Sequence, residues 1–165
     1  MVLIFVLRHG KTNSDNKLDK NIFKKSIPKI IKNIKVFTPI DNVKRIISSY
    51  RERCYSSGMM LSQNLDIELI GTEKLNRCDE GKKKSDVRLL DYAEKIKRNV
   101  AKHSKKDKDY AIILITHSSV YRTLVKFLAH NKEEATQEWL YFRCLTPIRY
   151  NEDDGRFYIE AYNYI

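Results

Sequence analysis

Two histidines follow two apolar stretches of the chain at positions that suit catalysis. Residues 2–7 are apolar without alternation and lead into Arg8 and His9, and residues 111–115 have the same character and lead toward His117. Such runs are typical of strands that are buried on both faces of a parallel sheet. Ligands of parallel sheets bind beyond the carboxyl ends of the strands. We therefore expect both histidines at the same edge of one sheet.

Arginines near these histidines favour phosphoryl transfer. Arg8 precedes His9, and Arg53 falls about one turn into a predicted helix behind a strand that ends at Ser49. Two guanidiniums can hold the oxygens of a phosphoryl group and disfavour protonation of a neighbouring imidazole. A neutral His9 could then attack phosphorus while His117 donates to the oxygens. Each of these residues alone could simply end a strand at the surface, but the combination predicts a cationic pocket.

Composition indicates a soluble globular protein of one domain. The chain has 165 residues, of which 42% are hydrophobic and 32% are charged, enough for a hydrophobic core without the profile of a disordered chain. We expect a single domain spanning residues 1–165. The apolar opening is too short for a membrane span and lacks the basic leader of a signal peptide, so we expect a cytoplasmic protein with no membrane partner.

The formal net charge of +11 favours anionic partners. A phosphorylated small molecule or a phosphoprotein fits this charge, and nucleic acid stays open although no recognition motif supports it. Cys54, Cys78 and Cys144 are far apart and lack metal-ligand spacing, so we expect reduced thiols and no metal or other cofactor. The sequence does not predict an oligomeric state.

Alternating strand and helix patterns predict the scaffold that positions these residues. We expect strands at residues 2–7, 43–47, 67–70 and 111–115, and a closing hairpin of residues 141–150 and 156–162. Helical patterns separate these strands. The order predicts a three-layer α/β/α sandwich with a mostly parallel sheet and an antiparallel edge strand.

Capping residues predict where two of the helices begin. Ser26 followed by Pro28 has the pattern of a hydroxyl cap with a proline in the first turn. Ser85 is predicted to cap the longest helix. The predicted buried face of that helix consists of Val87, Leu90, Ala93, Ile96 and Val100.

Three segments resemble motifs of the histidine phosphatase superfamily, which has the phosphoglycerate mutase-like fold. VLRHGKT at residues 6–12 looks like its nucleophile motif, and SSYRERCYSSG at residues 48–58 has the layout of a segment that places Arg53 on the family's arginine. ILITHSSV at residues 113–120 resembles the motif of the second histidine. The match covers nearly the whole chain, whose short length resembles the phosphohistidine phosphatase and small phosphatase branches.

The resemblance implies a metal-independent phosphatase that works through a covalent phosphohistidine on His9. Water would hydrolyse this intermediate after the first product leaves. The implied substrate is a phosphorylated anion, either a small phosphoester or a protein phosphohistidine. Catalysis would fall to His9, His117, Arg8 and Arg53, and phosphate binding to Arg8, Gly10, Thr12, Arg53, Arg77, His117 and Ser118.

The chain departs from the family pattern at three positions. Asp15 stands where many members have asparagine, and Tyr50 replaces the usual proline. The segment LNRCDEG at residues 75–81 looks like the loop that carries the acid glutamate, but Arg77 stands at the place of that glutamate.

Three interpretations of Arg77 stay open. A nearby carboxylate, Glu80, Asp79 or Glu73, could act as general acid. Alternatively, the substrate could need little acid, as when the leaving group is the imidazole of a phosphohistidine. As a third interpretation, the protein could be a catalytically weak or inactive phosphate-binding module of the same fold, and we rank a phosphoglycerate mutase below these.

Overall fold

A single mixed sheet organises the protein in a computed structural model that describes residues 1–76, 82–106, 109–135 and 144–161. Its six strands lie in the order β3-β2-β4-β1-β5-β6. The first four are mutually parallel, and β5 is antiparallel to β1 and to β6. The strands span β1 (Val2–Arg8), β2 (Val43–Ser49), β3 (Leu69–Thr72), β4 (Tyr110–Thr116), β5 (Leu145–Asn151) and β6 (Arg156–Ile159).

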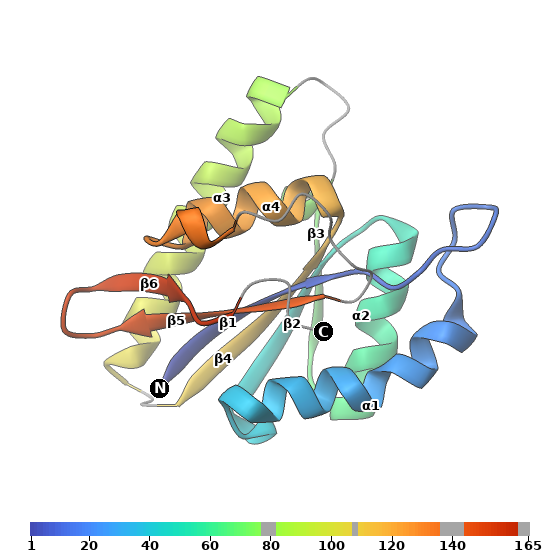
Figure 1. Ribbon diagram of the computed structural model, residues 1–165, viewed down its shortest axis with the longest axis horizontal. Coiled ribbons are helices and arrows are strands. Elements are labelled where there is room, and N and C mark those ends of the chain that lie inside the picture. The colour runs from blue at the N-terminus through green and yellow to red at the C-terminus, as the bar shows by residue number, and fades with distance from the viewer. Residues whose placement is uncertain (77–81, 107–108, 136–143, 162–165) are drawn as a thin grey trace.

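Helices cover both faces of the sheet, as Figure 1 shows. α1 and α2 pack on one face, and α3 and α4 pack on the other. The mostly parallel three-layer α/β/α sandwich predicted from the sequence is thereby confirmed, including the closing hairpin. The helices are α1 (Lys20–Phe37), α2 (Glu52–Leu65), α3 (Lys82–Ser104) and α4 (Ser118–Leu128), with short 3-10 turns η1 (Ile40–Asn42), η2 (Glu73–Leu75) and η3 (Lys132–Glu134).

The unbroken apolar character of β1 follows from its central position. Alternate side chains of a strand point to opposite faces, and each face of β1 meets a helical layer. Val2, Ile4 and Val6 pack with α3 and α4, while the intervening side chains pack with α1 and α2, namely Leu3, Phe5 and Leu7. All six are at most 1% exposed, so β1 is a rigid support for the residues that follow it.

The predicted start of the first helix is wrong. α1 begins at Lys20, where the carboxylate of Asp19 accepts a hydrogen bond of 3.0 Å from the backbone N–H of Ile22. Ser26 lies inside the helix, and its hydroxyl donates to the carbonyl of Ile22. Pro28 is exposed inside the helix, where water can bind the carbonyl that the missing N–H leaves open.

The predicted buried face of the longest helix is also wrong near its start. α3 begins at Lys82, so Ser85 lies inside it rather than at its cap. Val87 is 57% exposed and Leu90 is 43% exposed, because the first turns of α3 extend past the sheet, as Figure 1 shows. The prediction is confirmed at Ala93, Ile96 and Val100, and Leu89 is a buried apolar side chain that it missed.

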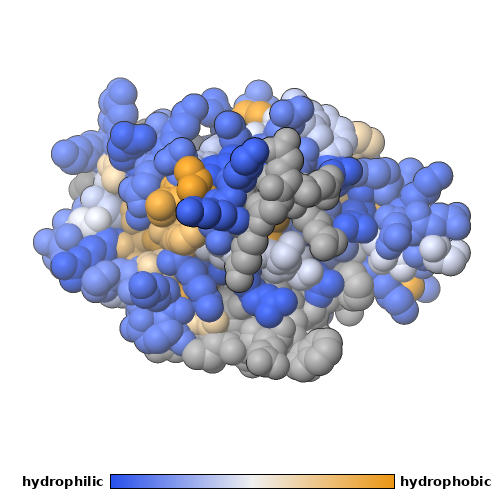
Figure 2. All heavy atoms as spheres, turned by 90° about the horizontal axis from the view of Figure 1, so that it is seen from above, coloured by the Kyte–Doolittle hydropathy of each residue, from blue (hydrophilic) through white to orange (hydrophobic). Residues whose placement is uncertain are grey.

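The surface is dominated by polar side chains. Seen from above, most of it is hydrophilic, with a small hydrophobic patch (Figure 2). No helix in the described ranges is both long enough and apolar enough to cross a bilayer. The two edge strands, β3 and β6, have four residues each, whereas the four inner strands have seven.

Candidate active site

His9 and His117 face each other at the carboxyl ends of two adjacent parallel strands. β1 and β4 pair so that Arg8 lies opposite Thr116. The residue that follows each of these strand ends in the chain is a histidine. The backbone N–H of His9 donates to the carbonyl of Thr116 at 3.2 Å. The imidazole rings lie edge to face, with centroids 5.4 Å apart, and both residues are buried. The two predicted histidines therefore meet in one site.

The hydrogen bonding of His9 defines the state of its ring. Nδ1 lies 2.7 Å from the carbonyl oxygen of Gly10, which can only accept, so Nδ1 carries a proton and the lone pair of the neutral ring is on Nε2. The pKa of His9 is lowered to about 4, mainly by burial and also by the positive charges of Arg53 and Arg8, while the hydrogen bond to Gly10 acts in the opposite direction. His9 is therefore neutral at physiological pH.

Gly10 lets the chain turn closely against α1 and α2. A Cβ at this position would overlap the ring of Phe23 and come within 2.8 Å of Leu18. The backbone N–H of Gly10 donates to the hydroxyl of Ser57 at 3.2 Å, and that hydroxyl donates to the carbonyl of Arg53. This contact ties the loop after β1 to the helix that carries Arg53.

Arg53 reaches His117 from the first turn of α2. Its Nε–H donates to Nδ1 of His117 at 3.2 Å, which requires the lone pair on Nδ1 and places the proton of a neutral ring on Nε2. Nε2 lies 3.2 Å from the hydroxyl oxygen of Ser49. The ring of His117 is thus held from both sides, by a guanidinium and by a hydroxyl.

Ser49 and Asn76 extend this network, and sequence reasoning missed both roles. The hydroxyl of Ser49 donates to Oδ1 of Asn76 at 2.6 Å, and the backbone N–H of Tyr50 donates to the same oxygen at 3.0 Å. The guanidinium of Arg88 donates to the backbone carbonyl of Asn76. No local pattern signals these links, because Asn76 and Ser49 are 27 residues apart.

Arg8 supplies further positive charge at the edge of the site. It is half-buried, and its backbone N–H donates to the carbonyl of Cys144 at 3.0 Å. Burial lowers the pKa of its guanidinium, as do the positive charges of Arg122 and Arg53, while Cys144 acts in the opposite direction. Arg122 lies on α4 beyond Ser118, and the sequence analysis did not single it out. Arg122 therefore adds positive charge beside Arg8, and Arg8 and Arg53 contribute to the field at His9.

Cys54 packs against His117 without being a nucleophile. Its Sγ lies 3.3 Å from Nε2 of His117, and the side chain is fully buried. Burial raises the pKa of this thiol to about 12, although the charge of Arg53 lowers it. The thiolate is the reactive form of cysteine, so at neutral pH Cys54 is a packing group.

Some of the remaining predicted site residues have described positions, and others do not. Ser118 is half-buried at the start of α4, where backbone N–H groups lack intrahelical partners and favour anions. Thr12 is half-buried and pairs with Leu18 in an isolated bridge. Glu73 is exposed in η2. The predictions for Arg77, Asp79 and Glu80 lie outside the described residues.

The described part of the chain contains no cluster of metal-ligating side chains. Among the residues with described positions, no three histidine, cysteine, aspartate or glutamate side chains are grouped so as to hold a metal ion. The groups that surround the histidines are instead guanidiniums, hydroxyls and backbone N–H groups.

Comparison with known proteins identifies the fold. No protein-family model and no curated protein sequence matches the chain. Among solved structures, a phosphoglycerate mutase from Bacillus anthracis superposes with a TM-score of 0.73 at 14% identity, covering 99% of this chain and 93% of the other. The chain has the phosphoglycerate mutase-like fold.

Two phosphatases of known structure share this phosphoglycerate mutase-like fold. A mycobacterial glucosyl-3-phosphoglycerate phosphatase superposes with a TM-score of 0.69 at 13% identity, covering 99% of both chains. The protein histidine phosphatase SixA, solved with tungstate, superposes with a TM-score of 0.67 at 13% identity, covering 96% of this chain and 94% of the other. The fold expected from the histidine phosphatase resemblance is thereby confirmed.

Proposed function

We propose that this protein is a cytoplasmic, metal-independent phosphatase of one domain, residues 1–165, that forms a phosphohistidine on His9. The observation that carries the proposal is the orientation of the His9 ring. Its Nδ1–H donates to the carbonyl of Gly10 at 2.7 Å, so the electron pair of the neutral ring is on Nε2. The ring lies beside a second imidazole and within the positive field of Arg53 and Arg8. A neutral imidazole in a cationic pocket is suited to attack a phosphoryl group.

In the first step, Nε2 of His9 attacks phosphorus. The N–P bond forms as the bond from phosphorus to the leaving group breaks, and the leaving group takes up a proton. Arg8 and Arg53 would hold the phosphoryl oxygens, whose charge increases in the transition state. His117 would donate from Nε2–H to the same oxygens by releasing its contact with Ser49.

In the second step, water attacks phosphorus and the N–P bond breaks. The electron pair of the N–P bond returns to Nε2 of His9, the proton of the water passes to the carboxylate that served as acid or to solvent, and inorganic phosphate leaves. The hydrogen bond from Nδ1 to Gly10 keeps the ring in one orientation through both steps, so the same lone pair is available for the next cycle.

The source of the proton for the leaving group separates two substrate classes. A phosphoester leaves as an alkoxide and requires an acid, for which Glu80, Asp79 and Glu73 are the candidates. A protein phosphohistidine leaves as an imidazole and requires little acid, which fits Arg77 at the place of the family's acid. The fold shared with a protein histidine phosphatase and with a glucosyl-3-phosphoglycerate phosphatase supports substrates of both kinds.

The second candidate is a phosphate-binding module that turns over slowly or not at all. Both ring nitrogens of His117 already have protein partners, Arg53 and Ser49, and Arg77 replaces the usual acid. This module would bind phosphate without forming a phosphoenzyme, and a phosphoglycerate mutase ranks below it.

Phosphoenzyme trapping distinguishes these functions. The protein is mixed with labelled acetyl phosphate or a labelled phosphohistidine peptide, quenched within milliseconds, and digested for mapping of the modified residue. We expect an acid-labile, base-stable phosphate on His9 that decays as inorganic phosphate appears. Binding of phosphate without any labelled His9 would refute the phosphatase and support the module.

A further inference from the structure

A groove runs along α3 on the side of the sheet edge formed by β3 and β2. A cleft of ≈ 860 Å³ lies between the start of α3 and the end of β3, and a second cleft of ≈ 550 Å³ continues along the helix. The two clefts share Thr72, Tyr92 and Lys95. We call the combined feature the α3 groove. It is outside the histidine site and has no role in the chemistry proposed above.

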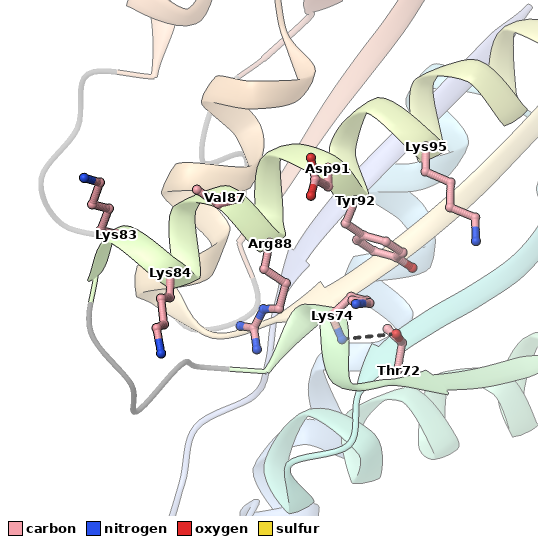
Figure 3. Close-up of a pocket in the computed structure, with 9 residues that line it drawn as sticks. All are labelled: Thr72, Lys74, Lys83, Lys84, Val87, Arg88, Asp91, Tyr92 and Lys95. Carbon is pink, nitrogen blue, oxygen red and sulfur yellow. Dashed lines mark hydrogen bonds between the residues drawn. The ribbon is translucent and has the colours of Figure 1, made fainter.

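The α3 groove is strongly basic. Its first cleft is lined by the cations Lys74, Lys83, Lys84, Arg88 and Lys95, and the second adds Arg45, Lys102 and Lys106. Asp91 is the one carboxylate among the lining residues, and in Figure 3 it points away from Thr72 and Lys74. Within the described residues, Lys74, Lys83 and Lys95 form no ion pair. These cations favour a ligand with several negative charges.

The same groove offers apolar surface. Val87 is 57% exposed at its margin, and the half-buried ring of Tyr92 extends from α3 toward Thr72 (Figure 3). Ile47 and Ile70 line the second cleft. A ligand that fills the groove therefore needs apolar groups between its charges. A peptide with acidic and apolar side chains meets both requirements, because the apolar lining residues Val87, Ile47 and Ile70 are aliphatic and suit aliphatic side chains better than stacked bases.

Hydrogen bonds link the wall of the groove to the histidine site. Arg88 lines the first cleft and donates to the backbone carbonyl of Asn76. The side chain of Asn76 accepts from Ser49, and Ser49 contacts His117. The pairing of β2 with β3 sets Thr72, which lines both clefts, opposite Ser49 at the end of β2. A peptide in the groove would thus carry its neighbouring residues toward the catalytic histidines.

We propose that the α3 groove binds an acidic, partly apolar peptide segment of a phosphorylated protein substrate. This inference rests on the proposed phosphatase function for its catalytic consequence, but peptide binding itself can be tested without any turnover. The groove would supply affinity for the protein around the phosphorylated residue, while the histidine site acts on the phosphoryl group.

Two triple variants with the same change in net charge form the core of the test. The groove variant is Lys74→Glu/Lys83→Glu/Lys95→Glu, and all three side chains are cleft-lining lysines. The matched control is Lys24→Glu/Lys29→Glu/Lys32→Glu on α1, whose lysines are exposed on the opposite face of the sheet. Because all of these side chains lie at the surface, both variants should fold, which circular dichroism and thermal melting would verify.

Fluorescence anisotropy measures binding of a short labelled peptide of alternating acidic residues and Leu or Phe. We expect the groove variant to bind about tenfold or more weakly, because three attractive charges become repulsive, and the control to change by less than about threefold. A peptide with Gln and Asn for the acids, and one with Ser for Leu and Phe, should each bind more weakly. Equal losses in both variants, or tighter binding of a single-stranded oligonucleotide than of the peptide, would overturn the proposal.

Kinetics then separate this proposal from the phosphatase proposal. With p-nitrophenyl phosphate, the groove variant should keep the turnover of the native protein. With the acidic peptide carrying a phosphorylated residue, its kcat/KM should fall about tenfold through KM. If the peptide binds through the groove but the native protein does not hydrolyse it, the phosphatase proposal is refuted and the groove proposal stands. If the groove variant hydrolyses the peptide as well as the native protein does, the groove proposal is refuted and the phosphatase proposal stands.

Discussion

Arg53 and His117 are joined by a hydrogen bond of 3.2 Å from the guanidinium Nε to the imidazole Nδ1. This bond selects the tautomer of His117 whose proton is on Nε2. It also holds the guanidinium beside the ring of His9, where its charge helps keep that ring neutral. Arg53 therefore acts on both histidines: it selects the tautomer of His117 and helps lower the pKa of His9.

Replacing Arg53 by lysine separates charge from geometry. Arg53→Lys keeps a cation but loses the planar fork and the Nε–H that bonds His117, so we expect kcat/KM for a phosphoester to fall about 10²-fold. Arg156→Lys, at an exposed position on β6, is the matched control and should keep native activity. A native kcat/KM in Arg53→Lys would contradict the role given to the guanidinium.

His9→Ala removes the proposed nucleophile. We expect hydrolysis of p-nitrophenyl phosphate to fall by about 10³-fold or more, because no phosphohistidine can form. His9→Asn serves as a second variant if the cavity left by alanine destabilises the protein. His130→Ala, at an exposed histidine, should retain activity, and unchanged turnover in folded His9→Ala would rule out the mechanism.

The protonation of His9 makes stability depend on pH. Its pKa is about 4 in the folded protein and 6.5 for an unperturbed histidine, since burial disfavours the charged ring. Between these values the unfolded chain binds more protons, so the free energy of unfolding rises with pH through this window. The contribution of His9, on the order of 3 kcal/mol, is present above pH 6.5 and lost as the pH falls toward 4.

NMR titration of the histidine ring protons, assigned by comparison with His9→Asn, tests this directly. We expect the His9 resonance to titrate near pH 4. Urea unfolding should show the native protein losing more stability than His9→Asn between pH 7 and pH 4.5. A His9 resonance that titrates near 6.5 would show that its ring is solvated and accessible to protons.

Ser49→Ala tests the hydroxyl that bridges His117 and Asn76. The variant removes the partner of Nε2 and leaves Oδ1 of Asn76 with the N–H of Tyr50 alone. The contact with Ser49 orients the ring of His117 before substrate binds, so without it we expect a less well positioned ring and a kcat about tenfold lower, with KM nearly unchanged. Ser48→Ala, which removes a hydroxyl that donates to the carbonyl of Ser49, should change kcat by less than about threefold. Equal effects would indicate a packing role.

Gly10→Ala tests the close approach of the loop after β1 to α1. The added methyl group would overlap the ring of Phe23, and we expect a loss of about 1–3 kcal/mol in the free energy of unfolding. Denaturant unfolding measures this loss. The double variant Gly10→Ala/Phe23→Leu should recover part of it, because the smaller side chain makes room. Simple additivity of the two losses would argue against the contact.

Much of the scaffold could be predicted because burial leaves a strong local pattern. β1 and β4 are central strands, so their residues are apolar on both faces, and the histidines that follow them are conspicuous. The positions of His9 and His117 therefore followed from the apolar runs and the rule for parallel strands. Arg53 followed from the helix behind β2.

The parts that could not be predicted depend on contacts between distant segments. Val87 and Leu90 have the spacing of a buried helix face, but α3 extends past the sheet there and both side chains are exposed. Ser26 has the form of a cap, but Asp19 caps the helix earlier and Ser26 bonds within it. Asn76 meets Ser49 only through the pairing of β2 with β3.

The lengths of the strands have a consequence for behaviour at high concentration. Each margin of the sheet is a strand of four residues, β3 on one side and β6 on the other. So short a ladder offers few main-chain groups to a second molecule approaching laterally. We expect the folded protein to resist strand-by-strand polymerisation in concentrated solution.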